Sequence, residues 1–130
     1  MDQFTNTPDT TANYAPDDIQ NNKGMAILAY LSWLVLIPLF AAKNSPFARY
    51  HTNQGLVLFL IGLVWGVVTK IATLLLGWIP ILGDVIGILL GIASFIVAIF
   101  SIVCLVLGIV NAAQGKAKEL PFIGGIRILK

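Results

Sequence analysis

The sequence predicts an all-α fold, a polytopic integral membrane protein in which a bundle of three transmembrane helices follows a disordered N-terminal tail. Three apolar runs, residues 25–42, 55–78 and 85–110, contain one charged side chain between them, that of Lys70. At about 1.5 Å of rise per residue, each run can cross a hydrocarbon core of about 30 Å as a helix, the first with little to spare. The composition agrees, because the chain is 58% hydrophobic and 11% charged, whereas soluble domains average about 25% charged residues.

Residues 1–22 are predicted to form an acidic, disordered tail. They are rich in Thr, Asn and Asp, contain Pro8 and Pro16 and show no periodic apolar pattern, so they bury too little surface to offset the ordering of the backbone. Lys23 is the one cation ahead of the first apolar run. Because a secretory signal needs a basic segment at this place, we expect residues 25–42 to be retained as a membrane span.

The transmembrane domain is predicted over residues 23–113, and turn residues set its internal boundaries. Ser45 can cap a helix that begins at Pro46, because proline suits the first position of a helix. Pro80 and the glycines that flank it end this second helix and begin the turn into the third. Residues 114–130 are then a short, basic C-terminal tail.

The placement of Lys and Arg predicts the orientation. With three spans, the first connection and the C-terminal tail share one side of the membrane, and the other side holds Lys23 and, if its side chain reaches the surface, Lys70. Because cations favour the cytoplasmic side, we expect a multi-pass protein of the plasma membrane with its N-terminus outside and its C-terminus in the cytoplasm. The cations on the predicted cytoplasmic side are Lys43, Arg49, Lys116, Lys118, Arg127 and Lys130.

Small residues form a stripe along the third predicted helix and a shorter stripe along the second. In lipid, small residues mark packing faces because they let two helix backbones approach closely. We expect the stripes to pack against each other, either within one chain or between copies of it. The helix-packing candidates are Gly62, Gly66, Gly83, Gly87, Gly91, Ser94, Ala98 and Gly108.

Lys70 is the one charged side chain within the apolar runs. A lysine at the centre of a bilayer costs about 2.5–3.5 kcal/mol on insertion scales, and less when its stem carries the ammonium toward the surface. Asp84, just past the turn, is a candidate partner. Two interpretations stay open: a polar site in the bundle that handles an ion or a substrate, or a lysine paired with Asp84 or lipid phosphate.

A cluster of polar residues is predicted near the cytoplasmic ends of the second and third helices. His51 and Gln54 enter the bundle one turn apart, whereas Arg49 points elsewhere and suits lipid phosphate. Asn111 and Gln114 lie at a similar depth on the third helix. The cluster either binds a ligand or is an interfacial anchor whose polar groups are satisfied within the protein.

The residue types for catalysis, a cofactor or a metal site are not grouped in this sequence. One His and the single Cys104, which lies inside an apolar run, cannot form a Cys/His zinc site. No glycine-rich phosphate-binding motif opens a helix. We therefore expect no enzyme activity, cofactor or metal, and no binding of nucleic acid, because the cations are few and lie near the membrane surface.

Three segments carry a resemblance to a known family: residues 28–31 (Leu-Ala-Tyr-Leu), residues 47–55, which hold an Arg-x-His-x-x-Gln signature, and residues 112–124. They resemble small bacterial membrane proteins that are grouped with the channel-forming subunit of the chloroplast inner-envelope protein import translocon. The resemblance covers about residues 23–125, although those plastid relatives have four spans. It implies a polytopic helical membrane domain and a role in moving or assembling proteins at a membrane.

The resemblance and the packing stripes together predict a non-enzymatic membrane subunit, a scaffold or accessory component of a membrane transport or protein-translocation assembly. Its expected partners are the lipid bilayer and other membrane protein subunits or further copies of the chain. The alternative is an oligomeric channel or small carrier, with Lys70, His51 and Gln54 lining a polar path.

Overall fold

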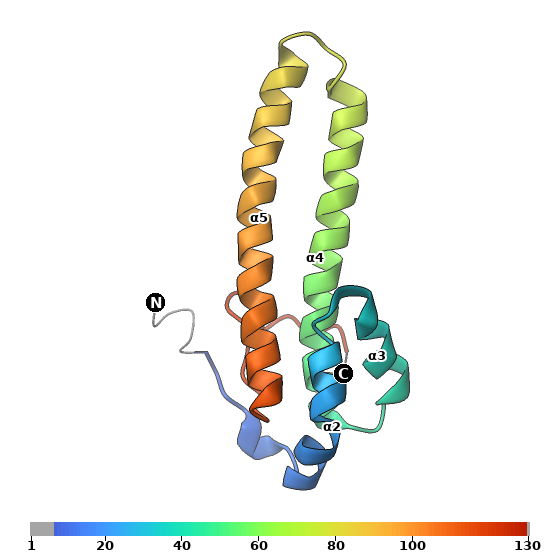
Figure 1. Cartoon of the computed structure of the whole chain (residues 1–130), viewed down its shortest axis with the longest axis vertical. Coiled ribbons are helices and arrows are strands. Elements are labelled where there is room, and N and C mark those ends of the chain that lie inside the picture. Colours follow the sequence, from blue (N-terminus) through green and yellow to red (C-terminus); the bar gives the residue numbers. More distant parts are fainter. Residues whose placement is uncertain (1–6, 130) are drawn as a thin grey trace.

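Two long antiparallel helices form a tall hairpin, and shorter segments gather round its open end (Figure 1). The structure is a computed structural model that describes residues 7–129, so residues 1–6 of the predicted tail and Lys130 lie outside the described residues. The prediction of an all-helical protein is confirmed, and the described residues contain no named strand. The elements are η1 (Thr11–Asn13), α2 (Pro16–Leu28), η2 (Ser32–Val35), α3 (Leu36–Ala41), α4 (Pro46–Leu76) and α5 (Leu82–Ala113).

The hairpin begins and turns where the sequence predicts. The Ser45 hydroxyl accepts a hydrogen bond from the Ala48 amide at 3.1 Å, and Pro46 is the first residue of α4. At the far end, which we call the tip (residues 77–81), the chain turns tightly into α5. A β-carbon on Gly83 would lie only 2.3 Å from the Gly77 carbonyl oxygen, so this close approach requires glycine.

Both long helices are long and apolar enough to cross a membrane, but only part of each is free to face lipid. α4 has 31 residues, a length of about 46 Å, and its buried residues all lie between Phe47 and Leu58. Beyond Leu58, large apolar side chains such as Leu74 on α4 and Phe95 on α5 are exposed. That distal part of α4 measures about 27 Å, which matches the hydrocarbon core of a bilayer.

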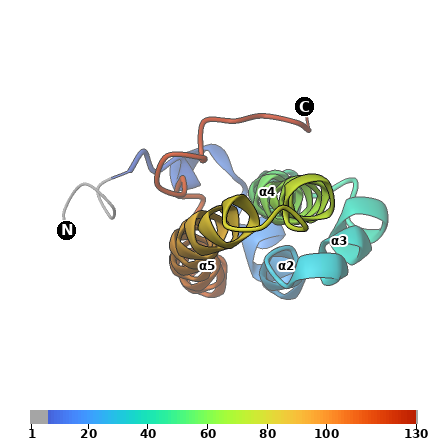
Figure 2. The same ribbon diagram turned by 90° about the horizontal axis from the view of Figure 1, so that it is seen from above.

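The third predicted span is not confirmed, because residues 25–42 do not form one continuous helix. α2 ends at Leu28, Ser32 has a φ of 56°, and the chain continues through η2 into the short helix α3. Figures 1 and 2 show α2 and α3 side by side next to the first turns of α4. The first apolar run therefore turns back on itself, and among the described residues only α4 and α5 are candidate spans.

The N-terminal segment lies against the C-terminal tail, at the open end of the hairpin. The Thr10 amide donates to the Ala117 carbonyl at 2.9 Å, and the Glu119 amide donates to the Pro8 carbonyl at 3.0 Å. This arrangement differs from the predicted one, in which three spans separate the two tails. The predicted helix start near Lys23 also differs, because α2 begins at Pro16.

The small-residue stripe packs only in part within the chain. Gly108 makes room for the Tyr30 ring, whose nearest carbon would lie 2.3 Å from a β-carbon at this position, and Ser94 accepts a hydrogen bond from Trp65 Nε1 at 2.9 Å. Ala98 is exposed. At four further stripe positions a β-carbon would meet no atom within 4 Å, so α4 and α5 do not pack along these glycines. They are Gly62, Gly66, Gly87 and Gly91.

Candidate functional site

Polar side chains are concentrated in the buried part of α4. This part belongs to what we call the folded end, the open end of the hairpin together with the segments packed on it (residues 7–58 and 104–129). His51, Thr52, Asn53 and Gln54 follow one another in the sequence and are each at most 2% exposed. Buried polar groups are costly unless they are hydrogen-bonded, so the partners of these side chains define the site.

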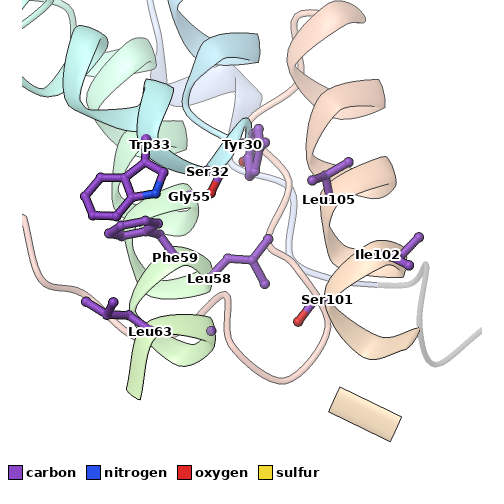
Figure 3. Close-up of a pocket in the computed structure, with 11 residues that line it drawn as sticks. Tyr30, Ser32, Trp33, Gly55, Leu58, Phe59, Leu63, Ser101, Ile102 and Leu105 are labelled. Atoms are coloured by element: carbon purple, nitrogen blue, oxygen red, sulfur yellow. The ribbon is translucent and has the colours of Figure 1, made fainter. Parts of the chain in front are cut away.

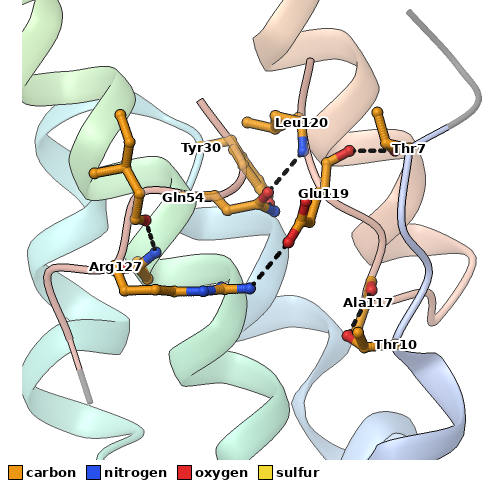
Figure 4. A network of polar contacts seen from close by, with 10 residues as sticks. Thr7, Thr10, Tyr30, Gln54, Ala117, Glu119, Leu120 and Arg127 are labelled. Carbon is orange, nitrogen blue, oxygen red and sulfur yellow. Dashed lines mark hydrogen bonds and ion pairs between the residues drawn. The ribbon is translucent and has the colours of Figure 1, made fainter. Parts of the chain in front are cut away.

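Tyr30 connects the segment that follows α2 to two residues of α4 that lie one helical turn apart. Its hydroxyl lies 2.5 Å from Nδ1 of His51 and accepts a hydrogen bond from Nε2 of Gln54 at 2.9 Å. The Gln54 Oε1 accepts from the Leu120 amide at 2.7 Å, and Nε2 of His51 lies 2.8 Å from the Lys116 carbonyl. Figure 4 shows Tyr30, Gln54 and Leu120 in this arrangement. We call these five residues the buried network.

The partners in the buried network fix the direction of each hydrogen bond. The Lys116 carbonyl can only accept, so Nε2 of His51 carries a proton and donates it. The Tyr30 oxygen already accepts from Gln54, so its own proton is directed at Nδ1 of His51. His51 is thus neutral, with its proton on Nε2. Burial raises the pKa of the Tyr30 phenol well above its ordinary value, although the Gln54 hydrogen bond opposes this shift, so Tyr30 stays a donor.

Asp18 of α2 completes the N-terminal cap of α4. One carboxylate oxygen accepts from the Ser45 hydroxyl at 2.5 Å, and the other accepts from the Phe47 amide at 2.9 Å. A carboxylate at a helix N-terminus also interacts favourably with the helix dipole. Asp18 therefore ties α2 to α4 at the end of the hairpin that carries both tails.

Asn53 holds the C-terminal tail against α4. Its side-chain amide donates to the Ile126 carbonyl at 2.7 Å, and its Oδ1 accepts from the amides of Ile128 at 2.6 Å and Leu129 at 3.0 Å. Within the same tail, Arg127 pairs with Glu119 at 3.3 Å (Figure 4). The tail is therefore fixed by a side chain of α4 that faces away from the solvent.

An apolar pocket of about 350 Å³ opens between η2, α4 and α5, above the buried network. Figure 3 shows the Trp33 ring standing edge-on to Phe59, and the two ring centroids are 4.7 Å apart. Ser32 and Ser101 provide the polar part of a lining that is otherwise mostly apolar. The pocket lies where the folded end meets the lipid-facing part of the hairpin.

The predicted polar cluster is divided between different places. His51 and Gln54 meet on Tyr30, whereas Arg49 lines a separate pocket with Lys43 and Arg127. Asn111 lies 3.5 Å from the Lys118 carbonyl, and Gln114 lines a small pocket with Lys116. The structure therefore contains a buried network and a basic pocket rather than one cluster.

Lys70 and Asp84 are not joined by an ion pair, since the one ion pair within residues 7–129 is that of Arg127 with Glu119. Lys70 lines a shallow groove with Gly62 and Gly66 on the lipid-facing part of α4. Across the described residues, no group of three or more His, Cys, Asp or Glu side chains is placed to hold a metal ion.

Three residues that the site depends on were not predicted from the sequence pattern. Tyr30 lay inside an apolar run, Asp18 lay in a segment assigned to a tail, and Asn53 was left out of the predicted cluster. A tyrosine in an otherwise aliphatic run was the available signal for the first of them, because a buried phenol needs a hydrogen-bond partner.

Comparison with known proteins identifies the family. The chain matches the model of the magnetosome magnetite crystal formation protein family, MamF/MmsF, over residues 21–129. It is 34% identical over 102 residues to magnetosome protein MmsF of Paramagnetospirillum magneticum (strain AMB-1), covering 78% of this chain and 81% of that protein. It is 30% identical over 100 residues to magnetosome protein MamF of the same organism, covering 77% of each. No solved structure matches the chain.

These matches correct two predictions. The kinship with the chloroplast import subunit is wrong, because the family model and both relatives are magnetosome proteins. The expected role in a transport or translocation assembly, as a subunit or as a channel, is wrong for the same reason. The membrane location stands on the two apolar helices and on the magnetosome relatives. This chain belongs to the magnetosome magnetite crystal formation protein family.

Proposed function

We propose that this chain is a non-enzymatic integral protein of a magnetosome membrane that contributes to the formation of magnetite crystals. The observation that carries the proposal is the family match, which runs from residue 21 to residue 129. It includes the turned-back segment, the whole hairpin and the tail held by Asn53. We therefore attribute this role to the whole described fold and not to one segment of it.

In this proposal the hairpin anchors the protein and the folded end lies at one membrane surface. Every Lys and Arg other than Lys70 lies outside residues 55–110 in the sequence. Because α4 and α5 form a two-span hairpin, these cations all belong to the side that carries the folded end. The positive-inside rule then favours a cytoplasmic folded end and a tip on the opposite side of the membrane.

We further propose that the folded end acts as a scaffold that other proteins of the same membrane bind. The buried network supports this, because its hydrogen bonds join the segment that follows α2, the helix α4 and the C-terminal tail in one arrangement. Fully satisfied polar networks of this kind specify a unique packing of their surroundings. A surface that is held rigidly can present the same contacts to each partner.

The test is complementation in Paramagnetospirillum magneticum from which MmsF has been deleted. We expect a fluorescently tagged copy of this chain to lie with the magnetosomes and to shift crystal size and number toward the wild type, measured by electron microscopy. The matched variant is Gly55→Leu, whose side chain would collide with the Ala29 carbonyl, and which should fail to complement. A correctly folded, membrane-inserted chain that changes neither the crystals nor its own distribution would contradict the proposal.

A further inference from the structure

A basic pocket lies on one side of α4, at the folded end. It has a volume of about 390 Å³, and three cationic side chains line it, those of Lys43, Arg49 and Arg127. They come from the α3–α4 connection, from α4 and from the C-terminal tail, so the fold brings Arg127 to two cations that lie far from it in the sequence. Among the described residues that line the pocket none is a carboxylate, and Glu119, the ion-pair partner of Arg127, lies outside it.

One buried polar atom in this pocket, the Tyr50 hydroxyl, meets the geometry of a hydrogen bond with no described residue, although it interacts with the Arg127 side chain. Tyr50 lines the pocket and is 5% exposed, and its hydroxyl is the single buried side-chain polar atom in the described chain without a well-formed hydrogen bond. The Arg127 guanidinium lies over the same ring, 5.0 Å from its centroid. A buried hydroxyl without a well-formed hydrogen bond is costly, and an oxygen of a bound anion would accept one.

An apolar groove continues from the basic pocket along α4. It also has a volume of about 390 Å³, and its lining includes Val57, Leu60 and Val64 of the helix. Asn53 in the pocket and Val57 in the groove are four residues apart, so they lie on the same face of α4 in successive turns. The groove therefore begins where the pocket ends and extends toward the lipid-facing part of the hairpin.

Successive residues of the C-terminal tail line the apolar groove and the basic pocket in turn. Ile126 and Ile128 line the groove, whereas Arg127 and Leu129 line the pocket. The hydrogen bonds of Asn53 to Ile126, Ile128 and Leu129 hold this register. The tail thus places an arginine on the charged side and two isoleucines on the apolar side of one continuous surface.

We propose that this surface binds an anionic phospholipid, with its phosphate among Lys43, Arg49 and Arg127 and an acyl chain along the groove. The charge of the pocket fits the phosphate, and basic pockets beside membrane helices are suited to anionic headgroups. The groove fits the chain, because it is apolar and lies at the start of the lipid-facing stretch of α4. The proposal rests on the membrane location alone and is independent of any role in crystal formation.

The test uses the full chain purified in a mild detergent. Phosphatidylglycerol and phosphatidylcholine with the same acyl chains are titrated, and bound lipid is counted by native mass spectrometry. We expect phosphatidylglycerol to bind more tightly than phosphatidylcholine. The double variant Lys43→Gln/Arg127→Gln should bind phosphatidylglycerol about twenty-five-fold more weakly, because each cation near a lipid surface contributes about fivefold. The matched control Lys116→Gln/Lys118→Gln removes the same charge from the folded end and should keep the affinity.

Two further arms separate the possible sources of the anion. Inorganic phosphate and glycerol phosphate should bind far more weakly than the lipid, because they lack the acyl chain. Val64→Trp, which fills the groove and changes no charge, should weaken the binding of phosphatidylglycerol, and it decides the question if the double variant fails to fold. Equal binding of the two lipids, equal losses in both double variants, or phosphate binding as tight as lipid binding would overturn the proposal.

Discussion

The hydroxyl of Tyr30 lies 2.5 Å from Nδ1 of His51, and this contact joins the turned-back apolar segment to α4. Both side chains are at most 1% exposed. The Tyr30 ring also packs on Gly108, where a β-carbon would lie 2.3 Å from it, so the same residue connects α5 to the site. Tyr30 is therefore the residue at which the three helical parts of the folded end meet.

Removing the Tyr30 hydroxyl should destabilise the protein. Tyr30→Phe leaves His51 Nδ1 and Gln54 Nε2 buried without their partner, so we expect a loss of about 1–3 kcal/mol in the free energy of unfolding. Tyr50→Phe is the matched control, because the Tyr50 hydroxyl makes no well-formed hydrogen bond to a described residue and has only its weaker interaction with Arg127 to lose. Denaturant titration in detergent without added lipid measures both, and equal losses would contradict the network.

His51 should be neutral with its proton on Nε2. The chain contains one His, so the two imidazole nitrogens of a ¹⁵N-labelled sample give an unambiguous pair of NMR signals. We expect the shift of an unprotonated nitrogen for Nδ1 and of a protonated nitrogen for Nε2. A proton on Nδ1, or protons on both nitrogens at neutral pH, would mean that the hydrogen bonds to Tyr30 and Lys116 run differently.

Gly55 should not tolerate a side chain. A β-carbon at this position would lie 1.8 Å from the Ala29 carbonyl oxygen, so Gly55→Ala must push α2 away from α4, at a cost of about 1–3 kcal/mol or more. Gly62→Ala, seven residues further along the same helix, meets open space and should leave stability unchanged or slightly raised. Thermal unfolding of the two variants compares them, and similar midpoints would argue against this helix crossing.

Asn53 should control the order of the C-terminal tail. Asn53→Ala removes three hydrogen bonds to residues 126–129, so the amides of Ile128 and Leu129 should exchange with solvent at least tenfold faster. Thr52→Val is the control, because the Thr52 hydroxyl bonds only to the Ala48 carbonyl of its own helix. Hydrogen exchange that is unchanged in Asn53→Ala would show that other contacts hold the tail.

The hairpin could be predicted from the sequence because its signals are local. Ser45 and Pro46 mark the start of α4, and Pro80 with its glycines marks the turn. The first apolar run gave a false span, since hydropathy counts apolar residues and does not register where the chain reverses. That reversal follows from tertiary contacts of Tyr30 with Gly108 and with Gln54.

The candidate site was predictable only on the α4 side. His51 and Gln54 are polar residues one turn apart at the edge of an apolar run, so their spacing alone indicates a shared direction. Their partners at Tyr30, Lys116 and Leu120 come from remote segments. The same limit applies to the basic pocket, because Arg127 reaches Lys43 and Arg49 only through the fold of the C-terminal tail.

The central claim is that α4 and α5 are the two membrane spans of a hairpin, and membrane topology tests it most directly. Two spans put both tails on one side of the membrane, whereas three spans would separate them. Reporter fusions at the N-terminus and at the C-terminus, together with a cysteine introduced at the tip (Ile79→Cys in a Cys104→Ala background), are probed with a membrane-impermeant label. We expect both fusions to report the cytoplasm and the tip cysteine to be labelled only from the opposite side. Fusions that report from opposite sides of the membrane would contradict the hairpin, and with it the position of the folded end.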